Sequence, residues 1–178
     1  MAVVGRRCLL SLIILCGLAA IGSARATDFS GRWTSDPEPA PAAPAPRPST
    51  GDMGSGWGAT ITITQDTARL TVEYAFFARG DLQPPMRFVY ALDGSESRNS
   101  VMMGRGIQVQ ASKAVWVDEA LVITTVHTFA DPSSGRPAAA EVKQTLRLES
   151  PASLLVETTR AGVFGGPPST TRTRYRKI

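Results

Sequence analysis

The stretch Phe29-Ser30-Gly31-Arg32-Trp33 decides the fold, because it sets a Gly-x-Trp at the head of a long run of strand-like sequence. A small residue two positions before a tryptophan, where alternating strands begin, suits an indole ring that plugs one end of an antiparallel barrel. The stretch therefore predicts a shape, and no later residue of the sequence settles what the protein does.

The residues before this stretch have the features of an export signal. Arg6 and Arg7 precede an uncharged apolar run, and Ala24-Arg25-Ala26 offers small residues where a signal peptidase cleaves. The apolar run is too short to span a bilayer comfortably, and no second run follows it. We expect residues 1–26 to be a cleaved signal peptide and the protein to be periplasmic or secreted, without stable membrane insertion after cleavage.

The leader also holds both cysteines, Cys8 and Cys16, so the mature chain has neither a disulfide nor a thiol ligand. A lipidated Cys16 and twin-arginine export through Arg6-Arg7 stay open as alternatives. The whole chain carries 19 Lys plus Arg against 15 Asp plus Glu, and three arginines leave with the leader, so 16 remain against 15, a net charge of +1. A nearly neutral domain has no general field to attract nucleic acid, and we expect no nucleic-acid partner.

Residues 35–58 differ in composition from everything after them. Proline and alanine alternate from Asp36 to Pro48, and glycine and serine follow up to Gly58. Alternating Pro and Ala favour an extended conformation with few backbone donors, so this connector is expected to stay out of a sheet as a disordered loop or a lid. Trp57 stands out in the connector, because an aromatic ring in a glycine-rich loop needs a place to dock.

From Ala59 onward the sequence alternates with a period of two, and no stretch has a helical period. The residues that share a strand face include Ile61 and Ile63; Leu70, Val72, Tyr74 and Phe76; Met86, Phe88, Tyr90 and Leu92; Leu121, Ile123 and Thr125; and Leu154 and Val156. This pattern predicts an all-β protein of about eight to ten short antiparallel strands in an up-and-down meander that closes into a barrel. Residues 27–34, the first short strand, and 59–178 would form this one domain; a two-sheet β-sandwich is the alternative.

Several local motifs strengthen the barrel interpretation. The Gly-x-Trp is joined by a Leu92-Asp93-Gly94 turn, by Ser112-Lys113-Ala114-Val115-Trp116, and by a closing Thr-Thr-Arg-x-x-Tyr that ends at Tyr175. Together they resemble the calycin group of lipocalins, fatty-acid-binding proteins and avidins, and more closely a set of secreted bacterial lipocalin-like proteins of unassigned role. The resemblance covers the whole mature chain and implies a lipocalin-like barrel.

The resemblance also implies how the barrel end is built. The ring of Trp33, with Gly31 beside it, would lie across the closed end, and an arginine of the last strand would stack on it: Arg172, Arg174 or Arg176. The chain departs from the group in lacking the lipocalin disulfide, the residues with which avidins hold biotin, and a regular strand directly after Trp33. The resemblance therefore supports a shape and does not supply a ligand.

Two functional hypotheses follow from the barrel. The first is an exported protein that binds a small hydrophobic molecule, with a pocket wall of Phe76, Met86, Phe88, Tyr90, Trp116 and Phe129. The second is a non-catalytic interaction module, in which these residues only fill the barrel and the Pro-rich arm or an outer sheet face engages an envelope protein.

The sequence gives little support to catalysis. His127 is the only histidine, it lies within an apolar strand, and a single histidine cannot build a His-rich metal site. The acidic pairs Asp118-Glu119 and Asp93 with Glu96 are expected in turns, where carboxylates usually face water. We therefore expect no enzyme activity, no catalytic residue, no metal and no cofactor.

Overall fold

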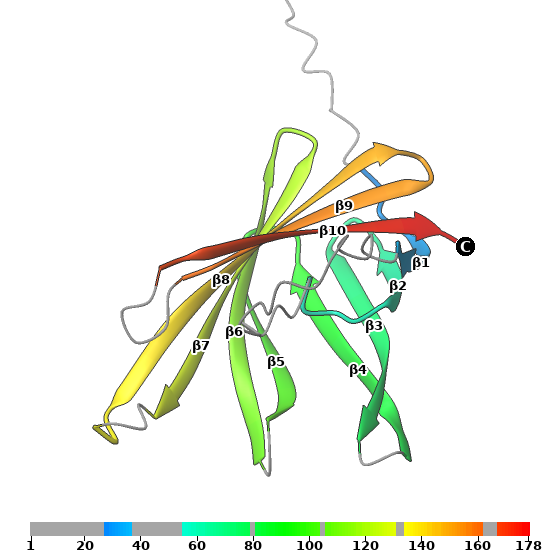
Figure 1. The fold of residues 1–178 in the computed structure, drawn as a ribbon. Helices are drawn as coiled ribbons and strands as arrows, with labels where there is room; N and C mark the ends of the chain where they lie inside the picture. The colour runs from blue at the N-terminus through cyan, green and yellow to red at the C-terminus, as the bar shows by residue number, and fades with distance from the viewer. Residues whose placement is uncertain (1–26, 37–54, 79–80, 104–105, 131–133, 162–166) are drawn as a thin grey trace, which may run out of the picture.

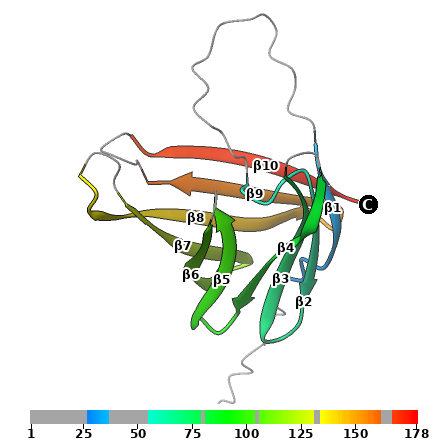
Figure 2. The same ribbon diagram turned by 90° about the horizontal axis from the view of Figure 1, so that it is seen from below.

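The computed structural model describes residues 27–36, 55–78, 81–103, 106–130, 134–161 and 167–178, and every regular element in this part of the chain is a β-strand. Ten antiparallel strands form one sheet that curls into a nearly closed barrel (Figures 1 and 2). They are β1 (Gly31–Ser35), β2 (Thr60–Gln65), β3 (Arg69–Ala78), β4 (Asp81–Ala91), β5 (Glu96–Met103), β6 (Gly106–Val117), β7 (Ala120–Ala130), β8 (Pro137–Ser150), β9 (Ser153–Arg160) and β10 (Ser169–Lys177). The predicted all-β meander is confirmed, and the arrangement is compatible with a calycin-like barrel.

The order of the strands follows the chain with one exception. The sheet runs β4-β3-β2-β1-β10-β9-β8-β7-β6-β5, so the first and last strands pair with each other in its middle. β1 is held on both sides, with Trp33 opposite Lys177 of β10 and opposite Ile61 of β2. The short Gly-x-Trp strand therefore joins the two halves of the meander.

The barrel closes between β4 and β5, the two strands at the ends of this order. Here side chains replace the regular backbone ladder: the Asn99 carboxamide accepts a hydrogen bond from Val89 N (2.7 Å) and donates one to Val89 O (3.1 Å). Ser97 Oγ accepts another from Ala91 N (2.8 Å). An amide side chain can satisfy one backbone N–H and one C=O at the same time, so this seam leaves fewer unpaired groups on the strand edges.

The inner face of the barrel is filled by every second residue, as the alternation predicted. Its fully buried large side chains include Trp33, Trp57, Tyr175, Phe29, Ile61, Ile63, Leu70, Leu121, Ile123, Leu146, Leu154 and Val72. On β9 the pattern is strict, with Leu154, Val156 and Thr158 buried and the residues between them partly exposed. Burial of this apolar face is what holds the disulfide-free sheet closed.

Candidate functional site

One end of the barrel is sealed by three aromatic rings, which we call the closed end: Phe29, Trp33 and Trp116. Phe29 and Trp33 are completely buried, and the Trp33 indole N–H donates to Phe29 O at 3.0 Å. The Phe29 ring stacks on that of Trp116 with centroids 5.8 Å apart and planes 6° from parallel. The indole is thus packed and hydrogen-bonded, as a plug at a barrel end requires.

A strap of residues 27–30 runs under this closed end. The Gln65 side chain of β2 makes two hydrogen bonds to the strap. Its Oε1 accepts from Phe29 N (3.0 Å), and its Nε2 donates to Thr27 O (2.8 Å). The Thr27 hydroxyl donates to Glu119 O in the turn between β6 and β7 (3.1 Å). The strap therefore connects β2 with the turn between β6 and β7. Phe29, which belongs to the strap, lies in the core.

The cation over Trp33 is Lys177, whose ammonium nitrogen lies 5.2 Å from the ring centroid. Its side chain crosses Gly31, where an added Cβ would come within 2.5 Å of Lys177 Cε, and Gly31 has a φ of +145°. Both the close approach and the backbone conformation favour glycine there. The Gly of the Gly-x-Trp thus makes room for the cation that covers the Trp.

This finding corrects the expectation that Arg172, Arg174 or Arg176 stacks on Trp33. The three arginines alternate with Tyr175, whose ring is buried, so they lie on the outer face of β10, opposite to the face on which Trp33 packs. There they pair with acids, at 2.7 Å to Glu157, 2.6 Å to Glu149 and 3.9 Å to Asp36. Lys177, at an odd position, is on the same side as Trp33.

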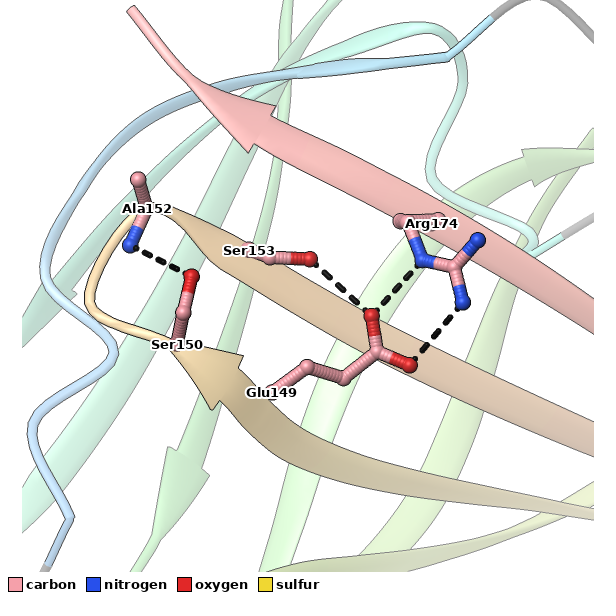
Figure 3. A network of polar contacts seen from close by, with 5 residues as sticks. All are labelled: Glu149, Ser150, Ala152, Ser153 and Arg174. Carbon is pink, nitrogen blue, oxygen red and sulfur yellow. Dashed lines mark hydrogen bonds and ion pairs between the residues drawn. The ribbon is translucent and has the colours of Figure 1, made fainter.

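Figure 3 shows the best-developed of these outer pairs. Glu149 accepts from Arg174 Nε (2.6 Å) and Nη2 (3.0 Å), and from the Ser153 hydroxyl (3.0 Å). The hydrogen bonds from Arg174 and then Ser153 lower the pKa of Glu149. The network lies in a surface depression that is lined by three arginines and two glutamates, together with Leu155. Its ion pairs are exposed, and such pairs contribute little to stability.

The described end of the connector, Ser55–Gly58, lies inside the barrel. Trp57 is 2% exposed and its ring is 6.4 Å from that of Tyr90 on β4. Tyr175 on β10 donates to Gly58 O (2.7 Å) and shares a 2.5 Å hydrogen bond with the Ser55 hydroxyl. Burial raises the pKa of Tyr175 to about 12, so its phenol stays protonated. Trp57 therefore docks in the interior; the rest of the connector, 37–54, and the leader, 1–26, lie outside the described residues.

The wall of the barrel beside Trp57 is aromatic. Tyr74 on β3 stacks on Phe88 of β4 at 6.0 Å, and Phe88 stacks on Tyr90 at 6.3 Å. Phe88 and Tyr90 are buried, whereas Tyr74 and Met86 are only half-buried on the same inner face. We call Tyr74, Met86, Phe88 and Tyr90 the aromatic wall.

The structure brings together only part of the predicted pocket wall. Met86, Phe88 and Tyr90 are neighbours on β4, but Trp116 packs at the closed end against Phe29. The side chains of Phe76 and Phe129 lie outside the described residues. Tyr74 was not included in the predicted wall, although its alternation with Leu70 and Val72 indicated the same face.

Facing this wall, β7–β10 and their neighbour β6 carry polar side chains on the inner face, which we call the polar layer: Ser112, Thr125, His127, Gln144, Thr158, Arg160 and Thr171. Ser112 and Thr125 share a hydrogen bond of 2.8 Å, and Gln144 donates to Ser55 O at 2.5 Å. Thr158 is fully buried, and its hydroxyl has no hydrogen-bond partner in the described part of the chain. The alternation in the sequence did not predict that these polar side chains would gather in the interior.

His127 lies half-buried in this layer. Burial, and then the positive charge of Arg160, lower its pKa below the ordinary value of 6.5. No nucleophile or carboxylate is found in hydrogen-bond contact with His127 among the described residues, so the geometry shows no catalytic arrangement there.

Other site types receive no support from the residues that the structure describes. No three His, Cys, Asp or Glu side chains within the described ranges gather as a metal-binding group. None of the described segments forms a helix long and apolar enough to cross a membrane. Comparison with known proteins found no matching family model, no matching curated protein and no matching solved structure.

Proposed function

We propose that this protein is an exported, lipocalin-like carrier that binds a small hydrophobic molecule against the inner face of its barrel. The observation that carries the proposal is the aromatic wall, where Tyr74 and Met86 stay half-exposed on the inner face beside the buried rings of Phe88 and Tyr90. Apolar and aromatic side chains on a concave surface are the usual lining of small-molecule sites.

The rest of the barrel indicates where such a molecule would enter. The strap and the rings of Phe29, Trp33 and Trp116 seal the closed end. Trp57 fills the interior next to Tyr90, so it would form the floor of the site. A ligand would therefore approach from the end remote from Trp33 and lie on Tyr74, Met86 and Phe88.

A paired substitution on β4 tests the proposal. Met86 is half-buried on the inner face, whereas the next residue, Arg87, is exposed on the outer face. The neutral fluorophore N-phenyl-naphthylamine should gain fluorescence with the purified protein. Met86→Ser should weaken its binding about threefold to tenfold, because full burial of such a side chain contributes roughly 1.5–3 kcal/mol and Met86 is already half-buried without the ligand.

Arg87→Ser is the matched control and should leave the binding unchanged. No fluorescence gain with wild type, together with no species retained from a lipid extract in native mass spectrometry, would exclude the carrier function.

Export is tested separately from binding. The leader composition predicts cleavage before Thr27, the residue at which the strap begins. N-terminal sequencing of the protein recovered from outside the inner membrane should start at Thr27. Recovery of the uncleaved chain in the cytoplasm would contradict export, and a lipid-modified N-terminus at Cys16 would instead establish a lipoprotein.

A second candidate, a non-catalytic envelope interaction module, is favoured by one surface feature. Exposed aliphatic side chains follow the outer face of β6 and reach β7: Ile107, Val109, Val115, Val117 and Val126. Exposed apolar patches often mark protein contacts. Val115→Lys with Val117→Lys should abolish capture of a defined envelope partner and preserve fluorophore binding if this function holds; the carrier function predicts that neither property changes.

A further inference from the structure

We infer that the outer face of β8–β10 carries a second binding site, where Arg147 holds the carboxylate of a small organic acid whose apolar part rests on Leu155. The site lies on the opposite face of the sheet from the aromatic wall. The inference therefore goes beyond the proposed carrier function and does not depend on it.

The site is the depression that surrounds the network of Figure 3, and we call it the outer hollow. It has a volume of about 410 Å³ and is lined by Arg147, Glu149, Leu155, Glu157, Arg172 and Arg174. In the strand register Arg147 is opposite Leu155, and Leu155 is opposite Arg174. Because Leu155 is only half-buried, a molecule in the outer hollow would rest on an aliphatic floor with an arginine on either side.

The charges that line the outer hollow do not cancel. Three arginines face two glutamates, which leaves a net charge of +1. Arg172 Nε lies 2.7 Å from the Glu157 carboxylate, and Arg174 binds Glu149 through Nε (2.6 Å) and Nη2 (3.0 Å). Arg147 is exposed, and its guanidinium makes no hydrogen bond or ion pair with any residue that the structure describes. All of its side-chain donors are therefore available to a ligand.

The acids near the outer hollow are held on the side of β10. Figure 3 shows the Glu149 carboxylate bound by Arg174, and the Ser153 hydroxyl donates to the same group at 3.0 Å. Asp36 pairs with Arg176 at 3.9 Å and comes directly after β1, which lies on the other side of β10 from β9 and β8. An incoming anion would therefore find its strongest attraction at Arg147.

A carboxylate fits these surroundings better than a more highly charged anion does. The planar fork of a guanidinium binds the two oxygens of a carboxylate through parallel hydrogen bonds. One negative charge matches the net charge of the outer hollow, whereas Glu149 and Glu157 would repel the second charge of a phosphate dianion. The half-buried Leu155 adds an apolar contact, so an acid with a small hydrocarbon group gains more than acetate.

The experiment titrates the isotope-labelled protein with benzoate at constant ionic strength and follows the amide and arginine Nε–H signals by NMR. Shifts should centre on Arg147 and Leu155. Arg147→Gln should weaken benzoate binding about tenfold, because it removes a hydrogen-bonded charge. Arg98→Gln is the matched control and should leave the affinity unchanged, since Arg98 is an exposed arginine of β5 that pairs with Glu96 outside the outer hollow.

Leu155→Thr tests the apolar floor without touching a charge. Threonine suits a strand, so the sheet should be preserved. The substitution should weaken benzoate binding about threefold and leave acetate binding unchanged, because acetate has almost no hydrocarbon to place on Leu155. Equal losses for benzoate and acetate would show that the residue acts only through the structure of the sheet, and would overturn its place in the site.

Three further probes decide whether a carboxylate is recognised. Benzamide, a neutral analogue, and chloride should bind at least tenfold more weakly than benzoate, and inorganic phosphate should bind no more tightly. Equal binding of benzamide or chloride, tighter binding of phosphate, or an equal loss in Arg98→Gln would overturn the inference. Benzoate shifts confined to Tyr74 and Met86, or no shifts at about 50 mM benzoate, would also overturn it. The carrier function is tested apart from these outcomes, by the fluorophore.

Discussion

The closed end and the polar layer are built from the same alternating strands, yet they differ in whether their buried polar groups are hydrogen-bonded. At the closed end, the indole N–H of Trp33 has its acceptor in Phe29 O and its ring is covered by Lys177. In the polar layer, the buried Thr158 hydroxyl has no hydrogen-bond partner among the described residues, and the Arg160 side chain donates to Thr171 on the inner face.

This difference separates the part of the barrel whose residues all favour folding from a part that contains residues unfavourable to folding. A sheet that needed only to fold would carry aliphatic residues along the whole inner face, as it does at Leu121, Leu146 and Leu154. Polar residues that cost stability usually persist because they contact something else. We therefore interpret the closed end as structural, and the polar layer as a part of the interior that stability alone does not explain.

The largest expected effect comes from breaking the closed end. Trp33→Ala should lower the free energy of unfolding by about 3–5 kcal/mol, because it empties a fully buried site and leaves Phe29 O without its donor. Chemical denaturation measures the change. Val115→Ala, on the exposed outer face of β6, should alter it by less than about 0.5 kcal/mol; equal effects of the two substitutions would contradict the plug.

A smaller loss of stability is expected from a substitution at Tyr175, which anchors the Ser55–Gly58 segment in the interior. Tyr175→Phe removes the hydroxyl that holds Ser55 and Gly58, and should cost about 1–3 kcal/mol because both partners lie in the interior. The loosened segment should also shift tryptophan emission to longer wavelength as Trp57 gains contact with water. Unchanged emission and stability would show that Ser55–Gly58 is not anchored by this phenol.

The sequence predicted the strands well because burial on one face imposes a period of two. Ile61 with Ile63 and Leu121 with Ile123 are on the buried face as predicted. The prediction that a terminal arginine stacks on Trp33 was wrong, although the alternation of these arginines with Tyr175 already indicated the outer face.

Other features depend on contacts that no periodicity encodes. Trp57 finds its position through Tyr90 and Tyr175, residues 33 and 118 positions away in the chain. The seam between β4 and β5 depends on Asn99 acting in place of a backbone group. The polar layer becomes visible only when the register of β8, β9 and β10 sets Thr158 beside Gln144 and Thr171.

The polar layer should also make stability depend on pH. Because the folded state lowers the pKa of His127, the unfolded state binds the proton more readily, and stability should fall as pH drops below the unfolded value of 6.5 toward the folded one. His127→Gln should flatten this part of the profile. Thermal melts across this pH range measure it, and identical slopes for both proteins would contradict a desolvated imidazole.

The smallest expected effect lies on the outer face, in the network of Figure 3. Glu149 has a lowered pKa in the folded state, so its contribution is present above the unfolded value and is lost as pH falls through the folded one. Glu149→Gln should lower the melting temperature slightly at neutral pH, and added salt should shrink the difference. A difference that survives in strong acid would rule out the ion pair as its cause.

The most direct test of the contrast between the closed end and the rest of the interior is a titration of the isotope-labelled protein with N-phenyl-naphthylamine, followed by NMR. We predict large shifts at Tyr74, Met86 and Phe88, with the Trp33 indole signal unmoved. Shifts centred on Trp33, or no shifts at saturating fluorophore, would contradict an apolar site on the inner face.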